Sequence, residues 1–274
     1  MQHIAVTGGS GKAGRATIRE LLAHGYRVRN VDIAAPSDEL APFQKTDLTE
    51  LGETVEALHG CDAVIHLAAN PNPTGRTEEV MFRHNTGSTY NVFRAAQLLG
   101  MQRVVWASSE TALGLPFERR PPPTVPVDET YSAPESSYAL SKLISEEMAH
   151  QFASWSGATY VGLRFTNIME QHDYARFAGW QDDPTQRQWN FWAYVDARDV
   201  AQACRKSLVA PLTGAEVFVI AAADTCMNRT NADLMAAYFP AVTIAPGTGS
   251  HDSLLSIAKA RRLLGYEPQH SWRS

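Results

Sequence analysis

The chain has 274 residues, 44% of them hydrophobic, and its 24 basic and 29 acidic side chains give a formal net charge of −5. This length and apolar fraction are typical of a globular protein that folds as one unit, and without a basic excess nothing recommends nucleic acid as a partner. No apolar run approaches the roughly 20 residues that cross a bilayer, and the N-terminus lacks the charged-then-apolar pattern of an export signal.

The three cysteines, Cys61, Cys204 and Cys226, are widely separated in the sequence. They match no disulfide framework, and no group of His, Cys and Asp has the spacing of a metal site. We therefore expect a cytoplasmic protein that has no membrane association and no bound metal.

Short β-rich runs alternate with longer helical stretches through the first two thirds of the chain. Strands are predicted at residues 3–7, 27–32, 63–67, 103–107 and 159–164, and helices at 12–24, 86–99 and 137–155. Strands that alternate with helices pair in parallel through right-handed crossovers, with helices on both faces of the sheet. The pattern predicts an α/β fold with a doubly wound parallel sheet.

The alternation stops at residues 115–134, where prolines crowd the sequence and exclude a helix interior or a central strand. We expect a long surface loop at the carboxyl edge of the sheet, either a passive connector or a flap over a substrate. After residue 165 the elements become shorter, with helices predicted at 197–208, 231–238 and 254–264 and a strand at 217–220.

A glycine-rich turn joins the first strand to the first helix, with glycines at positions 8, 11 and 14 of Thr7-Gly8-Gly9-Ser10-Gly11-Lys12-Ala13-Gly14. Glycine permits a tight turn, a close approach of the backbone to a pyrophosphate, and close packing of helix on strand. The helix N-terminus adds free N–H groups for the phosphates. The spacing predicts a Rossmann-type dinucleotide site, with these cofactor-binding residues: Gly8, Ser10, Gly11, Lys12, Ala13 and Gly14.

Asp32 ends the second predicted strand about 20 residues further on, where a carboxylate can accept hydrogen bonds from the adenosine ribose. A carboxylate at this place repels a 2′-phosphate, so the sequence favours NAD over NADP. Arg29 and Lys12 are nearby cations that keep NADP open as the alternative.

Tyr138 and Lys142 lie four residues apart in the helix predicted at 137–155, and so share one helix face. A neighbouring cation favours the phenolate, and a tyrosine with a lowered pKa can take the proton of a substrate hydroxyl while hydride leaves for a nicotinamide. Ser108 and Ser109 follow the strand at 103–107, at the sheet edge where ligands of such folds bind. A serine there can hold the reacting oxygen, or it can serve as a turn or capping residue.

The sequence resembles an extended short-chain dehydrogenase/reductase, the group that holds NAD-dependent sugar epimerases, dehydratases and sugar dehydrogenases. The resemblance runs nearly end to end. It rests on TGGSGKAG, Asp47-Leu48, His66-Leu67-Ala68-Ala69, Asn85-Thr86-Gly87, Ser108-Ser109, Tyr138-x-x-x-Lys142, Leu163-Arg164-Phe165-Thr166-Asn167, Tyr194-Val195-Asp196, and the closing Leu263-Leu264-Gly265-Tyr266-Glu267-Pro268.

The resemblance implies a role for each matching position. Tyr138 would be the base, Lys142 would lower its pKa and hold the nicotinamide ribose, and Ser109, five residues before Gly114, would polarise the substrate. Further cofactor contacts would come from Asp47, Leu48, Leu67, Ala68, Ala69 and Asn85, and substrate contacts from Asn70, Ser109, Glu110, Arg164 and Asn167. Arg164 and Asn167 could instead support the substrate loop, and Arg164 could equally be an ion-pair partner at a strand end.

Residues 1–164 would then form the NAD-binding core with the catalytic helix. Residues 165–274 would add to the sheet and form a small substrate-binding lobe within the same compact unit. Relatives in this family pair through the two long helices, so the resemblance also implies a homodimer.

The turn from Ala107 to Gly114 resembles that of uronate dehydrogenase and related aldose dehydrogenases, which oxidise C1 of a cyclic sugar to a lactone. Sugar dehydratases carry an Asp-Glu pair where this chain has Glu110-Thr111, and nucleotide-sugar epimerases have a larger C-terminal lobe. We therefore expect an NAD-dependent dehydrogenase of a small sugar-like molecule. A carboxylate at Glu110 would repel a uronate, which favours a neutral sugar.

Two other functions stay open: a nucleotide-sugar epimerase that uses the same tyrosine, and a non-catalytic NAD(P)-sensing protein. Several side chains could line a sugar pocket, although the tryptophans could equally be core residues and the histidine a surface residue: Asn70, Asn72, His172, Trp180, Trp189 and Trp192.

Overall fold

The computed structural model describes residues 2–71 and 77–274. Over these residues the central sheet has seven strands, all parallel, in the order β10-β7-β5-β4-β1-β2-β3. The strands are β1 (His3–Thr7), β2 (Arg27–Asp32), β3 (Phe43–Lys45), β4 (Ala63–His66), β5 (Arg103–Ser109), β7 (Thr159–Phe165) and β10 (Ala215–Ile220). The chain starts at the centre of the sheet and winds outward in both directions. The predicted doubly wound parallel sheet is confirmed.

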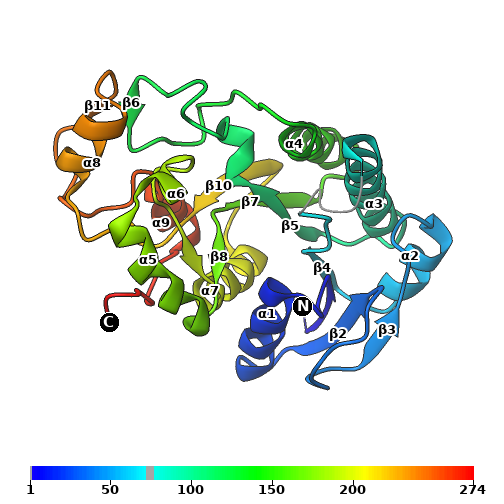
Figure 1. Cartoon of the computed structure of the whole chain (residues 1–274). Coiled ribbons are helices and arrows are strands. Elements are labelled where there is room, and N and C mark those ends of the chain that lie inside the picture. Colours follow the sequence, from blue (N-terminus) through cyan, green and yellow to red (C-terminus); the bar gives the residue numbers. More distant parts are fainter. Residues whose placement is uncertain (1, 72–76) are drawn as a thin grey trace.

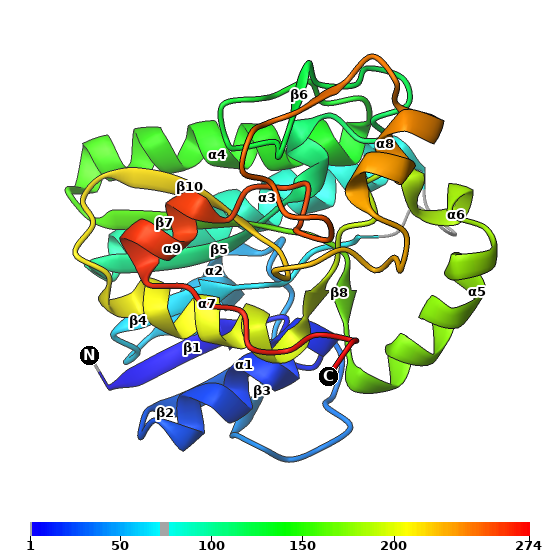
Figure 2. The ribbon, with the colours of Figure 1, turned by 90° about the vertical axis from the view of Figure 1, so that its left-hand side faces the viewer.

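Helices cover both faces of the sheet, so the molecule has three layers (Figures 1 and 2). One face carries α1 (Lys12–Ala23), α7 (Ala197–Val209) and α9 (Ala258–Leu264), and the other carries α2 (Leu51–Leu58), α3 (Glu78–Leu98) and α4 (Ser137–Ser156). A separate apolar core fills the space between the sheet and each helical layer. The central strands β1 and β4 are almost wholly buried because helices pack on both sides of them.

A small lobe lies beyond the carboxyl ends of the strands and has an apolar core of its own (Figure 2). It contains η1 (Glu110–Leu113), the paired strands β6 (Thr124–Val125) and β11 (Thr243–Ile244), the paired strands β8 (Ile168–Met169) and β9 (Val195–Asp196), and the helices η2 (Gln171–Arg176), α5 (Phe177–Asp182), α6 (Thr185–Gln188) and α8 (Asn231–Tyr238). The lobe therefore combines residues from the proline-rich segment with residues from the last hundred or so of the chain, while β10, α7 and α9 join the central layers.

The proline-rich segment 115–134 is part of this lobe and does not lie over the sheet edge as a flap. Leu115, Phe117, Val125 and Val127 are buried in the lobe core, and β6 pairs with β11. No residue of the segment lines the large cleft described below. Of the two roles expected for this loop, a passive connector or a flap over a substrate, the structure supports the connector, which is packed into the lobe core.

Some element boundaries differ from those predicted. Helix α3 begins at Glu78, eight residues earlier than expected, because the Thr77 side chain accepts a hydrogen bond from Val80 N and caps it. The last helix, α9, begins at Ala258, because Leu254 and Leu255 are buried in an extended segment beside Val127. No helix of the described residues is long and apolar enough to cross a membrane.

Candidate functional site

A cleft of about 720 Å³ runs along the carboxyl ends of the central strands. Its walls come from the loops after β1, β2, β4 and β5, from α3 and α4, and from the segment that follows β7. In an open parallel sheet this is the edge at which ligands bind, where the strand order reverses beside β1.

The glycine turn after β1 requires glycine for two separate reasons. Gly8 has a φ of 68°, and a Cβ atom on it would lie 2.5 Å from Ala68 N. A Cβ atom on Gly14 would lie 2.2 Å from Gly8 O, because the first turn of α1 packs against the loop. Gly11 precedes α1 without a side-chain capping bond, so the first N–H groups of the helix are left for an anion.

Asp32 ends β2 and lines the cleft beside this turn. Its Oδ2 accepts a hydrogen bond from Ser10 N and its Oδ1 accepts one from Ala34 N, each at 3.1 Å. Ser10 itself does not line the cleft, since its hydroxyl donates to Ala34 O at 2.8 Å. Ser10 therefore shapes the turn and holds Asp32 in place.

The cleft continues to Asp47 and Leu48, the pair after β3. Asp47 Oδ1 accepts hydrogen bonds from Thr49 N at 2.9 Å and from the Thr49 hydroxyl at 2.7 Å. These two bonds lower the pKa of Asp47. The carboxyl group of Asp47 is therefore ionised at neutral pH.

The opposite side of the cleft is formed by the segment after β4 and by α3. Leu67, Ala68 and Ala69 line it. Asn85 on α3 exchanges two hydrogen bonds with the backbone of Asn70: its Oδ1 accepts from Asn70 N at 2.8 Å and its Nδ2 donates to Asn70 O at 3.1 Å. Asn85 thus fixes the position of Asn70 at the cleft.

Ser109, Tyr138 and Lys142 meet in the middle of the cleft, although β5 and α4 are far apart in sequence. Lys142 Nζ donates to Ala107 O at 2.8 Å and lies 5.6 Å from the centroid of the Tyr138 ring. A hydrogen bond between Ser109 and Tyr138 favours the phenolate. Thr111 donates to Ser109 Oγ from its backbone N at 3.2 Å and from its hydroxyl at 3.0 Å. The oxygen of Ser109 therefore accepts twice and keeps its own proton to donate.

Burial raises the pKa of Tyr138 to about 12; the Ser109 hydrogen bond lowers it, and the charge of Glu110 raises it further. Burial also lowers the pKa of Lys142 to about 8, against the opposing effect of the Glu146 carboxylate. The expectation that Lys142 brings the Tyr138 pKa below its ordinary value is wrong for the protein on its own. Burial outweighs the Ser109 hydrogen bond, and Lys142, whose Nζ is bonded to the Ala107 carbonyl, is not among the groups that shift the Tyr138 pKa.

Arg164 does not line the cleft, and the expectation that it contacts the substrate is wrong. It is 3% exposed, and its Nε and Nη2 bind the two oxygens of Glu146 at 2.8 and 2.7 Å. Its Nη1 donates to Glu129 O in the proline-rich segment at 3.1 Å, and Ser108 Oγ donates to Glu146 Oε1 at 2.5 Å. The alternative role, an ion-pair partner at a strand end, is confirmed.

Glu110 borders the cleft but is only 4% exposed. Asn190 Nδ2 donates to both of its carboxyl oxygens, each at 3.2 Å. Burial raises the pKa of Glu110 to about 8, against the opposing charge of Arg187 and these hydrogen bonds. A carboxyl group with so high a pKa carries less negative charge at pH 7 than an exposed glutamate, which weakens the argument from charge against a uronate. The preference for a neutral sugar stays a prediction.

Asn167 and Trp189 line the far end of the cleft, where the lobe meets the sheet. Trp180 and Trp192 are buried in the lobe core, and His172 is exposed on η2. Asn72 lies outside the described residues. Sequence reasoning assigned no role to three residues at this end of the cleft, because their contacts with Ser109, Asn167 and Glu110 form only in the folded lobe: Thr111, Arg187 and Asn190.

Arg29 and Lys12, the two cations that left NADP as the alternative cofactor, both bind other groups of the protein. Arg29 Nη1 donates to Ala57 O at 2.8 Å and to His59 O at 3.0 Å. Lys12 lines the cleft at the start of α1, but its Nζ is bonded to Asp173 Oδ2 at 2.5 Å. Neither cation is left free beside Asp32.

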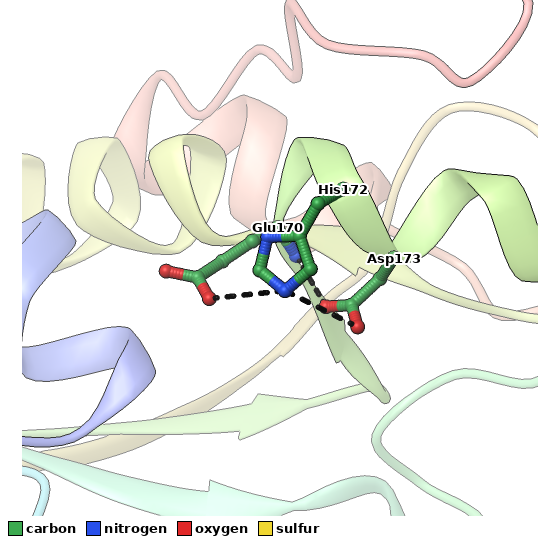
Figure 3. A group of neighbouring side chains, drawn as sticks. All are labelled: Glu170, His172 and Asp173. Carbon is green, nitrogen blue, oxygen red and sulfur yellow. Dashed lines mark hydrogen bonds and ion pairs between the residues drawn. The ribbon is translucent and has the colours of Figure 1, made fainter.

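Glu170, His172 and Asp173 bring their side chains together at the start of η2, as a metal site would (Figure 3). Both carboxylates already have cationic partners, since Arg15 binds Glu170 at 3.1 Å and Lys12 binds Asp173. The imidazole of His172 is largely exposed. A cation would have to displace both ion pairs. These pairs connect the start of α1, next to the glycine turn, to the lobe.

The features of the cleft fit a dinucleotide. A helix N-terminus without a capping side chain follows a turn in which two glycines leave no room for a Cβ atom, and a carboxylate stands at the end of the next strand.

A protein-family model described as the NAD dependent epimerase/dehydratase family matches residues 4–180. An L-arabinose 1-dehydrogenase (NAD(P)(+)) of Haloferax volcanii is 33% identical over 172 residues, 60% of this chain and 66% of that protein. An NAD-dependent glucose-6-phosphate dehydrogenase of the same organism is 28% identical over 62% of this chain and 70% of its own length. A UDP-glucose 4-epimerase of Lacticaseibacillus casei is 29% identical over 60% of this chain and 51% of its own length.

Solved structures share the whole fold. A mutated uronate dehydrogenase superposes with a TM-score of 0.72 at 22% identity, covering 99% of this chain and 83% of that one. A short-chain dehydrogenase/reductase superfamily protein from Agrobacterium tumefaciens with bound NAD has a TM-score of 0.75 at 23% identity, covering 99% of this chain and 94% of that one.

Proposed function

The chain belongs to the NAD dependent epimerase/dehydratase family, whose cofactor is NAD, and from this we propose that it is a dehydrogenase that oxidises a hydroxyl group of a free sugar or sugar-like molecule. In a cyclic aldose the oxidised carbon would be C1 and the product a lactone. The observation that carries the proposal is that Ser109, Tyr138 and Lys142 converge in the cleft that begins at the glycine turn.

The residues divide the chemistry between them. Tyr138 takes the proton of the substrate hydroxyl at its phenol oxygen, as a general base. Ser109, whose oxygen accepts twice from Thr111, donates its proton to the reacting oxygen or to the phenolate. Bound NAD would supply the hydride acceptor, so that loss of the hydroxyl proton to Tyr138 and of a hydride to the cofactor would leave the substrate as a carbonyl compound and yield NADH.

The cofactor would lie along the glycine turn, Asp32, Asp47 and Leu48 on one side and Leu67, Ala68 and Ala69 on the other. Lys142, whose pKa burial lowers to about 8, is mostly charged at pH 7 and can donate to a ribose hydroxyl as well as to Ala107 O. Asp32 would accept hydrogen bonds from the adenosine ribose, which supports NAD over NADP.

A small substrate would bind at the end of the cleft lined by Asn70, Asn167 and Trp189. The whole cleft measures about 720 Å³, within the roughly 300–1,000 Å³ of a typical ligand pocket. The Haloferax relatives that act on single sugars point in the same direction.

A panel of free aldoses, uronates and nucleotide sugars, each incubated with NAD or NADP, tests the proposal. We expect steady formation of NADH, followed by its near-ultraviolet absorbance, with at least one free sugar. Tyr138→Phe should lose at least about a hundredfold in kcat and still bind NAD, as measured by calorimetry.

The second candidate function is that of a nucleotide-sugar epimerase, because a UDP-glucose 4-epimerase is among the relatives. Conversion of UDP-glucose to its 4-epimer without net NADH would replace the dehydrogenase proposal by this one. Equal NAD binding by wild type and Tyr138→Phe, with no turnover of any sugar by either protein, would favour a sensor.

A further inference from the structure

We propose that Arg187 is a positioning residue for the substrate, which acts by turning the amide nitrogen of Asn167 into the cleft as a hydrogen-bond donor. The inference rests on the proposed function in one respect, that a sugar-like molecule occupies the cleft end lined by Asn167. It adds a specificity element that the family match does not supply.

Two hydrogen bonds fix Asn167. Its backbone carbonyl accepts from Val195 N at 3.1 Å, and its side-chain Oδ1 accepts from Arg187 Nη1 at 2.9 Å. The residue lies just after β7 and is held from β9 and from α6 of the lobe, so both its backbone and its side chain are set before a ligand arrives.

Arg187 decides which end of the amide faces the cleft. A guanidinium group only donates hydrogen bonds, so the atom of Asn167 that it binds has to be the oxygen. The amide nitrogen then points elsewhere, and none of the described residues accepts a hydrogen bond from it. Because Asn167 lines the cleft, this NH₂ group is presented to whatever occupies it.

Arg187 can hold this role because it is itself immobile. It is 5% exposed, and its Nη2 donates to Ala193 O at 2.7 Å. Its guanidinium carbon lies 4.8 Å from the ring centroids of both Trp180 and Trp189, so it is held between two aromatic faces. Trp189 also lines the cleft, and so the same arginine supports two substrate-facing side chains.

The arrangement selects for a substrate atom that accepts a hydrogen bond without having to donate one. Hydroxyl oxygens, the ring oxygen of a pyranose and carboxylate oxygens all meet this condition. A sugar that lacks the oxygen opposite Asn167 would leave the amide NH₂ without a partner, and such a deoxy sugar should bind more weakly.

A double-mutant cycle tests the proposal. Asn167→Ala and Arg187→Met should each raise KM by about five- to tenfold, the usual effect of losing one neutral hydrogen bond, and change kcat less. The double variant should be no worse than Asn167→Ala alone, because the arginine would have lost the group through which it acts. Arg205→Met is the matched control, since it removes a half-buried arginine that pairs with Glu20 on the far side of the sheet, and it should leave KM unchanged.

Multiplicative losses in the double variant would overturn the proposal and leave Arg187 as a merely structural residue. The same conclusion would follow if Arg187→Lys, which keeps a donor and a charge, failed to recover any of the lost affinity. Asn167→Asp offers a further check, because a carboxylate bound to Arg187 presents an acceptor to the cleft in place of a donor. It should weaken sugar binding at least as much as Asn167→Ala does.

The test separates this inference from the proposed function through a binding readout. The cycle is repeated by calorimetry on the Tyr138→Phe background with NAD present, with L-arabinose and UDP-glucose as probes. If wild type oxidises no sugar, the dehydrogenase proposal fails, but coupled losses in binding of either probe would still support the role of Arg187. Uncoupled losses, or no binding of either probe at this site, would overturn it.

Discussion

At the scale of single residues, the neutral state of Glu110 is set by its surroundings. Its pKa is raised to about 8 in the folded protein, chiefly by burial, so folding favours the protonated form. The stability that this contributes is fully present below the ordinary carboxyl pKa and is lost as the pH rises through about 8. Since one pKa unit corresponds to about 1.4 kcal/mol, the loss amounts to a few kcal/mol by pH 9.

We therefore expect Glu110→Gln to unfold at a higher temperature than wild type at pH 9 and at nearly the same temperature at pH 5. Glutamine keeps the shape and cannot ionise. Thermal unfolding of both proteins across this pH range checks the prediction, with the exposed Glu118→Gln as control. A constant difference at all pH values would mean that Glu110 is ionised throughout or is held by other interactions.

The hydrogen bond from Ser109 should be visible in the pH dependence of catalysis. It lowers the pKa of Tyr138 while burial raises it to about 12. The base is the deprotonated phenol, so kcat/KM for oxidation should rise with pH as the phenolate fraction grows. In Ser109→Ala the rise should move to higher pH, with a lower kcat/KM at pH 7. Ser137→Ala is the control, because its hydroxyl binds Glu78 at 2.7 Å. An unmoved profile would exclude Ser109 from tuning the base.

At the scale of elements, the junction of β1 and α1 depends on space that only glycine leaves. A Cβ atom on Gly14 would meet the Gly8 carbonyl at 2.2 Å, whereas one on Gly52 in α2 would meet nothing within 4 Å. Gly14→Ala should therefore lower both the unfolding temperature and the affinity for NAD. Gly52→Ala should raise stability by about 0.5–1 kcal/mol, as expected for glycine in a helix. Calorimetric NAD titration and thermal unfolding test both; equal behaviour of the two variants would contradict the close approach.

The sequence revealed most central elements because short β-rich runs alternate with longer helical stretches. It missed β3 and α2: β3 is three residues long and partly exposed at the sheet edge, and α2 has only two turns. It could not place Arg164, since the partner Glu146 lies on α4 and only packing brings the two together. The burial that keeps Glu110 neutral, and that raises the Tyr138 pKa, depends in the same way on the folded lobe.

At the scale of the whole molecule, the outer sides of α3 and α4 carry large exposed apolar side chains. Four of them are exposed in the single chain: Tyr90 by 46%, Leu98 by 54%, Leu140 by 44% and Trp155 by 61%. Exposed apolar side chains that gather on neighbouring helices often mark an interface. We expect two copies to pair through α3 and α4.

Trp155→Glu should shift the chain toward monomer in sedimentation or size-exclusion measurements, because a carboxylate would be buried in the interface. Val209→Glu is the matched control: Val209 is 64% exposed, but it lies at the end of α7 on the opposite face. An unchanged oligomeric state in Trp155→Glu, or a monomeric wild type, would contradict this interface.

The two walls of the cleft have separate origins in the chain. Apart from Glu110 and Thr111 on η1, every residue that borders it up to Lys142 belongs to the layers that hold the cofactor's turn, carboxylate and base, whereas residues 165–168 and Trp189 belong to the lobe junction. Behind that junction, Arg187 binds Asn167 and Ala193, and Asn190 binds Glu110. The stretch 167–193 also supplies Glu170 and Asp173, the ion-pair partners of Arg15 and Lys12 on α1. An exchange limited to residues 185–193 between members of the family would leave these two ion pairs in place and replace Arg187, Trp189 and Asn190, so that substrate preference changes while the cofactor-binding turn keeps its contacts.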